Sequence, residues 1–161
     1  MQENLVKSKQ RVKQHGEVFT PKWVVNDMLD LLIQNGKDPF ADLDATFLEP
    51  AAGNGNFVVE ILRRKLGHCK SDADVLRAVK SIYVVELLPD NVKEIIDRCI
   101  DLLGNKATPD IKRVLCANIQ QGDFLKQVHT DGSDIVFIDW ADNEKPHTLK
   151  EIIKQHDENK R

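Results

Sequence analysis

Short apolar runs alternate with longer segments of helical periodicity through most of the chain. Four apolar runs predict buried strands, at residues 45–49, 81–86, 112–118 and 133–140. The remaining periodic segments predict helices, at residues 21–35, 57–66, 71–80, 89–103 and 147–156. Strands that alternate with helices favour right-handed crossovers, and hence a parallel sheet with helices on its faces. The pattern therefore predicts an α/β fold with about four parallel strands.

The helix expected after residue 20 has recognisable start and stop signals. Thr20 is a suitable cap, Pro21 suits the first helical position, and Gly36 is suited to the end. Its core-facing positions, which recur at helical spacing, are expected to be Val24, Met28, Leu29 and Leu32.

Acidic residues and glycines follow the ends of the predicted strands. Glu49 ends the first strand and a glycine turn follows it, Glu86 ends the second, Asp123 follows the third, and Asp139 lies at the end of the fourth. In parallel sheets ligands bind at the carboxyl ends of the strands. We therefore expect a ligand site at this edge of the sheet.

Composition fits a single globular domain. The chain has 161 residues, of which 41% are hydrophobic and 30% charged, with a net charge of −3. There is no apolar run of the roughly 20 residues that a membrane span needs, and the first residues do not resemble a secretory signal. The three cysteines and five histidines show no metal-binding spacing. We expect a cytoplasmic protein with reduced thiols, no metal site and no membrane contact.

Three segments are distinguished by charge and pattern. Residues 1–16 form a basic arm, either a solvated tail or an arm that contacts phosphates. Residues 17–145 contain the predicted sheet, and residues 146–161 form a C-terminal helix or tail.

The stretch FLEPAAGNGNF at residues 47–57 predicts a strand-to-helix turn around a ligand. It lacks the lysine of a phosphate-binding P-loop. It also lacks the third glycine of a dinucleotide fingerprint, since Val58 occupies that position, and the next strand-end acid, Glu86, comes about ten residues later than that fingerprint requires. S-adenosylmethionine is the remaining class, because it carries a cationic sulfonium, an amino group and a ribose diol but no phosphate.

The acids at the strand ends suit that cofactor. Glu49 can lie near the amino group or the sulfonium, and Glu86 can accept both ribose hydroxyls. Asp123 can accept from the adenine amino group, while Phe124 or Leu87 covers the ring. Structural interpretations remain open beside these: Glu49 as a helix cap, Glu86 as a surface acid and Asp123 as a turn residue.

Four segments together resemble the amino-group DNA adenine methyltransferases of type I and type IIG restriction–modification systems. They are GEVFTPKWVV (16–25), FLEPAAGNGNF (47–57), YVVELLPDNV (83–92) and ANIQQGDFL (117–125), in the order of that family. The resemblance implies a Rossmann-like S-adenosylmethionine-dependent methyltransferase fold with strand order 3-2-1-4. The cofactor-binding residues that it implies are Phe19, Thr20, Pro21, Glu49, Pro50, Ala51, Gly53, Gly55, Phe57, Glu86, Leu87, Asp123 and Phe124.

The catalytic motif of that family, Asn/Asp-Pro-Pro-Tyr/Phe after the fourth strand, is not intact here. Asp139 falls in the acceptor position and Trp140 follows it, without the two prolines. The pair could be a rearranged acceptor and stacking ring. The alternative, which we favour, is an ordinary strand end with Trp140 covering the sheet.

Two functions follow as expectations. The chain is either a minimal adenine-specific DNA methyltransferase, or a catalytically inactive relative that binds the cofactor or a protein, as in a phage or mobile-element protein acting on host restriction or defence. Methylation of RNA or protein is a third option without a specific signal. DNA and a protein partner are both possible partners. The strand at residues 134–139 is expected to be covered by a second copy of the chain, or by residues 146–156 through Leu149, Ile152 and Ile153.

Overall fold

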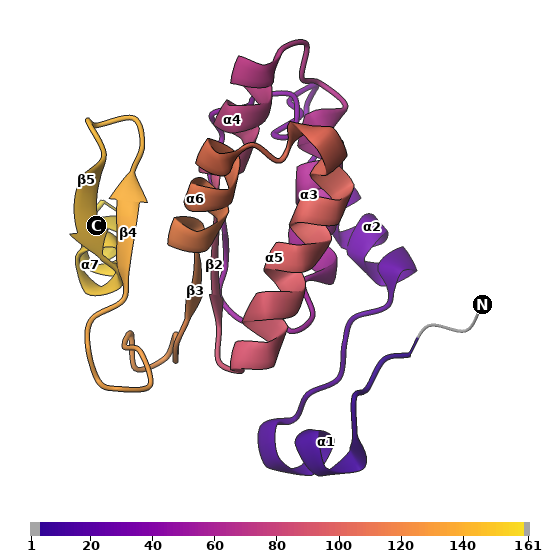
Figure 1. The fold of residues 1–161 in the computed structure, drawn as a ribbon, viewed down its shortest axis with the longest axis vertical. Coiled ribbons are helices and arrows are strands. Elements are labelled where there is room, and N and C mark those ends of the chain that lie inside the picture. The colour runs from indigo at the N-terminus through magenta and orange to yellow at the C-terminus, as the bar shows by residue number, and fades with distance from the viewer. Residues whose placement is uncertain (1–3, 160–161) are drawn as a thin grey trace.

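The computed structural model describes residues 4–159 and has a small parallel sheet at its centre (Figure 1). The sheet consists of β1 (Phe47–Glu49), β2 (Ile82–Glu86) and β3 (Ile119–Gln121), in the order β1-β2-β3. Phe47 of β1 is opposite Ile82 of β2, and Val84 of β2 is opposite Ile119 of β3. The predicted α/β class and the relative order of the first three strands are confirmed.

Helices cover one face of this sheet. They are α3 (Asn56–Leu66), α4 (Asp72–Lys80), α5 (Pro89–Leu103) and α6 (Pro109–Asn118), with a 3₁₀ turn, η1 (Gly104–Lys106), between the last two. Ile82 and Val84 of β2 join the main hydrophobic core with these helices. Tyr83 and Val85 alternate with them along the strand and belong to a second, smaller cluster on the other face.

The third strand was predicted at the wrong residues. Residues 112–118 belong to α6, and the strand is the short segment that follows. Thr108 caps α6 by accepting from the N–H of Ile111, and Pro109 occupies the first turn. Ile111, Val114 and Leu115 are buried at helical spacing. The apolar run that indicated a strand is therefore the buried stripe of a short helix.

The fourth strand was predicted in the wrong place. β4 (Val136–Asp139) does not join the parallel sheet, because it pairs antiparallel with β5 (Lys145–Thr148). The turn between them is closed by the N–H of Lys145 and the carbonyl of Asp142. This turn lies within the five-residue loop 140–144, and its two central residues, Asn143 and Glu144, both have positive φ, of 50° and 58°.

The C-terminal segment covers β4, which is one of the two arrangements expected for this strand. α7 (Leu149–Glu158) begins with a capping box formed by Thr148 and Glu151. Leu149 is fully buried with Ile135 and Phe137. Ile152 and Ile153 also pack against this cluster.

The N-terminal helices differ in detail from expectation. α2 (Lys22–Asp30) buries Val25 and Leu29, whereas Met28 and Leu32 are 50% and 47% exposed. The helix has no side-chain cap from Thr20 and ends well before Gly36. It is preceded by α1 (Lys9–His15), which lies against the first turns of α5 through contacts described below.

A buried lysine supports the loop before β1. Lys65 of α3 is fully buried, and its Nζ donates to the carbonyls of Asp42, Leu43 and Ala45 at 2.9, 3.3 and 2.8 Å. Burial lowers the pKa of Lys65 to about 8.

Candidate cofactor pocket

A pocket of about 450 Å³ lies at the carboxyl ends of the three parallel strands. The turn after β1, the end of β2 and the turn after β3 all contribute to its wall. Eight of the residues implied by the family resemblance line it: Phe19, Pro50, Ala51, Gly53, Glu86, Leu87, Asp123 and Phe124. The structure therefore brings together residues from all four of the sequence segments that carry the resemblance.

Five of the implied residues do not line this pocket: Thr20, Pro21, Glu49, Gly55 and Phe57. Glu49 accepts from the N–H of Ala51 at 3.3 Å, and burial together with the nearby Glu86 raises the pKa of Glu49. The carbonyl of Thr20 accepts from Nδ2 of Asn56 at 2.8 Å, which links the start of α2 to α3.

The two glycines of the turn have different local reasons for being glycine. Gly53 has φ of 55°, and a Cβ there would lie 3.2 Å from the ring of Phe19. Gly55 has φ of 84°, and a Cβ there would lie only 2.7 Å from Cγ1 of Ile95. Gly55 thus permits close packing of the turn against α5, whereas Gly53 faces the pocket and the Phe19 side chain.

Glu86 is a buried acid in the wall of the pocket, with several backbone and side-chain donors around it. It is 6% exposed, and its carboxylate accepts from the N–H of Gly53 at 2.8 Å, the N–H of Leu88 at 3.0 Å and Nδ2 of Asn91 at 3.2 Å. A carboxylate has about four acceptor positions, so about one remains, on Oε2. Glu86 can therefore take one ligand hydroxyl without losing a protein contact, rather than the two that the sequence suggested.

Asp123 is held in a turn beside the pocket. Its carboxylate accepts from the N–H of Lys126 at 3.1 Å, and this bond, with the Lys126 ammonium 3.3 Å away, lowers the pKa of Asp123. The N–H of Asp123 donates to the carbonyl of Val128. The acid is thus ionised and fixed in position next to Phe124, which also lines the pocket.

Residues that the sequence did not single out complete the wall: His15, Gly16, Glu17, Val18, Leu88, Asn91, Gly122 and Leu125. Most of them lie inside the same four sequence segments, so their position next to recognised residues was the available signal. Asn91 and Glu17 have a further role because they belong to a buried polar network.

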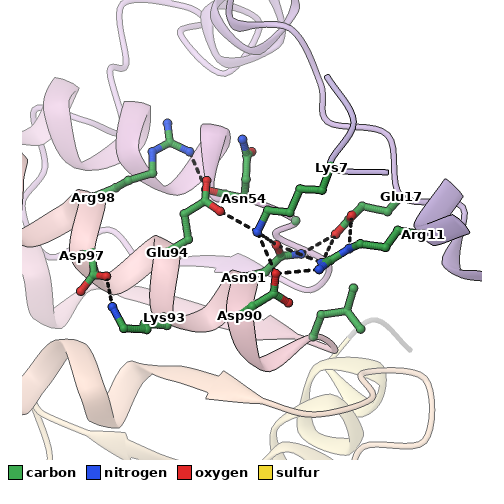
Figure 2. A network of polar contacts seen from close by, with 12 residues as sticks. Lys7, Arg11, Glu17, Asn54, Asp90, Asn91, Lys93, Glu94, Asp97 and Arg98 are labelled. Carbon is green, nitrogen blue, oxygen red and sulfur yellow. Dashed lines mark hydrogen bonds and ion pairs between the residues drawn. The ribbon is translucent and has the colours of Figure 1, made fainter. Parts of the chain in front are cut away.

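The network connects the basic N-terminal segment to α5 (Figure 2). Arg11 forms a two-bond ion pair with Glu17, with both distances 2.6 Å. The Arg11 guanidinium also lies 2.6 Å from Asp90 and lowers the pKa of Asp90 to about 2. Burial would raise the pKa of Glu17, but Arg11 and Asn91 outweigh it and lower that pKa. Lys7 and Arg11, two of the cations expected to meet solvent or phosphates, instead contact carboxylates of the same chain; residues 1–3 lie outside the described part.

Asp139 and Trp140 lie at the opposite edge of the sheet. Ile135 approaches Gly122, just after β3, whereas Trp140 Nε1 donates to Asn118, just before β3, at 2.8 Å. β4 therefore runs from the carboxyl ends of the parallel strands toward their amino ends. The carboxylate of Asp139 accepts from the backbone of its own turn, at Ala141 and Asp142.

Trp140 packs against the main hydrophobic core beside Asn118, which fits the alternative interpretation of this strand end. The Lys80 ammonium and the Arg113 guanidinium both lie over its ring, at 5.4 and 5.1 Å from the ring centre. Asn118, its hydrogen-bond partner, donates in turn to the carbonyls of Val79, Lys80 and Ile82. Neither Asp139 nor Trp140 lines the candidate pocket at the strand ends.

A second pocket, of about 750 Å³, lies on the face of the sheet opposite α3–α6. It is mostly apolar, with Leu48, Tyr83, Phe137 and Ile153 in its wall and Asp139 at one end. The hydroxyl of Tyr83 donates to the carbonyl of Ile138 at 2.9 Å. Burial, with Asp139 nearby, raises the pKa of Tyr83 to about 12, so this hydroxyl stays protonated.

Comparisons with known proteins do not assign the chain. No family model, no curated protein and no solved structure matches it. Between residues 4 and 159, none of the helices has both the length and the apolar character that crossing a membrane requires. A functional assignment therefore depends on the geometry of the pocket itself.

Proposed function

We propose that the chain binds S-adenosylmethionine in the pocket at the strand ends, as a methyltransferase-like protein related to the DNA adenine methyltransferases of restriction–modification systems. One observation carries the proposal. Gly53, Glu86 and Asp123, from the ends of three neighbouring strands, border one pocket with Phe19. These are the positions where a parallel sheet presents groups to a nucleoside ligand.

The charge of the pocket favours this cofactor over a phosphate-bearing one. Three carboxylates, Glu17, Glu86 and Asp123, line the pocket, and none of the described residues in its lining is lysine or arginine. Arg11 pairs with Glu17 and Lys126 lies 3.3 Å from Asp123, so Glu86 supplies most of the negative charge. A phosphate would be repelled there, whereas a sulfonium and an ammonium group would be attracted.

The proposed pose uses the free acceptor position of Glu86. Its Oε2 accepts one ribose hydroxyl while the contact with Gly53 is kept. Asp123 accepts from the adenine amino group, and Phe124 and Leu87 flank the ring. Phe19 and the turn at Pro50 and Ala51 then surround the methionine portion.

Between the two expected functions, the position of Asp139 favours a binding module without methyl transfer. Transfer needs an acceptor for the target amino group close to the sulfonium, and a misplacement of about 1 Å already costs on the order of a hundredfold in rate. Asp139 lies at the other edge of the sheet and outside the pocket lining. An active enzyme would therefore need its acceptor from a partner.

Calorimetric titration tests the proposal. S-adenosylmethionine should bind the folded chain with one site, and ATP, which has a similar nucleoside but three phosphates, should not compete. Asp123→Asn should weaken binding by about 1 kcal/mol through loss of one charged acceptor, while the matched change Asp131→Asn, in a turn outside the pocket, should not. Absence of cofactor binding by well-folded protein contradicts the proposal.

A further inference from the structure

The N-terminal strap, defined here as residues 5–19, forms one wall of the cofactor pocket. Its last five residues, 15–19, all line that pocket. The strap closes on itself, because the N–H of Phe19 donates to the carbonyl of Leu5 at 2.7 Å. Gly16 ends α1 with φ of 64°, and the chain reverses direction there. A movement of the strap would therefore open or close the pocket.

Charged contacts hold the α1 part of the strap against α5, whereas Phe19 at the end of the strap is buried. α1 buries none of its side chains. Lys7 Nζ lies 3.0 Å from Asp90 and 2.6 Å from Glu94. Arg11 Nη1 lies 2.6 Å from Asp90. Contacts of this kind weaken with salt, since the screening length falls from about 10 Å at 0.1 M to about 3 Å at 1 M.

Asn91 belongs to the same polar network as Lys7, Arg11 and Glu17 (Figure 2). It also contacts Glu86, which lines the pocket. Asn91 is fully buried, and its Nδ2 donates to Oε1 of Glu17 at 2.7 Å and to Oε1 of Glu86 at 3.2 Å. Its Oδ1 accepts from Lys7 at 2.7 Å and from Arg11 at 3.3 Å. The strap cations thus orient the amide so that its nitrogen meets both carboxylates. If the strap leaves, of these side-chain contacts Asn91 keeps only the one with Glu86.

We infer that the N-terminal strap is a salt-sensitive gate on the cofactor pocket, and that Asn91 is a positioning residue that transmits strap closure to Glu86. The inference rests on the proposed function only for the identity of the ligand. Low ionic strength keeps the strap closed and Glu86 aligned. High ionic strength releases the strap, which opens the pocket. Asn91, the partner of Glu86, then loses the strap contacts that orient its amide.

Amide hydrogen exchange measured by NMR on the full chain tests the gate without any ligand. The variant Arg11→Gln removes the ion pairs with Glu17 and Asp90, and Lys13→Gln is its matched control. Lys13 lies on the same helix, is exposed and has no ion pair in the described structure. We expect Arg11→Gln to accelerate exchange at the Phe19 N–H on the order of tenfold, and Lys13→Gln to leave it within about twofold. Added salt should accelerate the same amide in the unmodified chain.

A second exchange measurement tests whether Asn91 transmits strap closure to Glu86. It follows the Gly53 N–H, which donates to Glu86. Arg11→Gln should accelerate exchange there as well, but should add nothing in the background of Asn91→Ala. If Asn91→Ala does not fold, the comparison of Arg11→Gln with Lys13→Gln at Gly53 still decides the point. If Arg11→Gln accelerates exchange at the Phe19 N–H but not at the Gly53 N–H, the proposed role of Asn91 is overturned.

Two failures can be told apart. Equal exchange at Phe19 in Arg11→Gln and Lys13→Gln, without a salt effect, overturns the gate whether or not a cofactor binds. With S-adenosylmethionine added, the gate predicts faster dissociation from Arg11→Gln than from Lys13→Gln. If no variant binds the cofactor while Phe19 still responds to Arg11→Gln, the gate stands and the proposed function fails.

Discussion

The backbone N–H of Gly53 donates a 2.8 Å hydrogen bond to Oε2 of Glu86, which ties the glycine turn after β1 to the last residue of β2. Two sequence segments separated by more than thirty residues thus define one side of the pocket. The bond also gives Glu86 a structural role that is independent of any ligand.

Glu86→Gln should therefore lower the free energy of unfolding as well as affinity. The amide would keep the shape of the side chain but present an NH₂ group to one of three donors that now reach an acceptor, leaving that donor unpaired in a buried site. We expect a loss of about 1–3 kcal/mol in urea unfolding. Asp97→Asn, which breaks only an exposed pair with Lys93, should cost at most about 1 kcal/mol. Equal stability of Glu86→Gln and the unmodified chain would contradict this role.

Gly55→Ala should destabilise the chain more than Gly132→Ala. Both glycines have positive φ, 84° and 86°, so both substitutions incur a similar backbone strain. Only at Gly55 would the new Cβ meet another residue, 2.7 Å from Cγ1 of Ile95, while nothing lies within 4 Å at Gly132. We expect an additional loss of about 1–3 kcal/mol at Gly55 from this overpacking. Thermal or urea unfolding of the two variants measures the difference, and equal losses would show that the turn does not pack on α5 in this way.

Lys65 should make stability depend on pH in the alkaline range. Its pKa is about 8 in the folded chain, against 10.5 for the ordinary group. Between these values the unfolded chain binds more protons, so the contribution of Lys65 to stability rises with pH. The rise should approach about 3 kcal/mol, since one pKa unit corresponds to about 1.4 kcal/mol.

Lys65→Met isolates this effect, because the other titrating groups are present in both chains. The difference in unfolding free energy between the unmodified chain and Lys65→Met should be constant below pH 8 and should grow in favour of the unmodified chain up to pH 10.5. A difference that stays flat over this range would mean that the buried ammonium is not destabilised by its surroundings.

The isolated chain should transfer little or no methyl group to DNA, and Asp139→Ala should leave cofactor affinity unchanged. Asp139 accepts from the N–H groups of Ala141 and Asp142, which is the behaviour of a turn residue. Incubation with labelled S-adenosylmethionine and duplex DNA, followed by analysis for methyl-adenine, measures transfer. Ordinary turnover that Asp139→Ala abolishes would establish Asp139 and Trp140 as a compact catalytic site.

The sequence predicted the pocket better than it predicted the C-terminal part of the fold. Gly53, Glu86 and Asp123 were recognisable because each lies at or just after the end of a strand, and parallel strands bring their carboxyl ends together. The same pattern could not show that Gly53 and Leu88 already occupy acceptor positions of Glu86, because that depends on the backbone geometry of two turns.

The hairpin of β4 and β5 could not be predicted from the sequence for a different reason. A turn with two successive positive φ values usually carries glycine, as in Asn-Gly, but in the loop 140–144 Asn143 is followed by Glu144. Pro146 within β5 also weakens the strand pattern. In α6, Val114 and Leu115 form too short an apolar run for helix and strand to be distinguished by composition. The contacts of Lys7 and Arg11 with Asp90 could not be inferred because Asp90 is more than seventy residues away along the chain.

Chemical-shift mapping by NMR during titration with S-adenosylmethionine tests the central claim most directly. Saturable shifts are expected at the amides of Gly53, Leu87 and Asp123, which border the pocket, and not at Trp140, at the opposite edge of the sheet. An absence of saturable shifts in the folded chain, or shifts centred on Trp140 and the larger apolar pocket, would contradict the assignment of the cofactor to the strand ends.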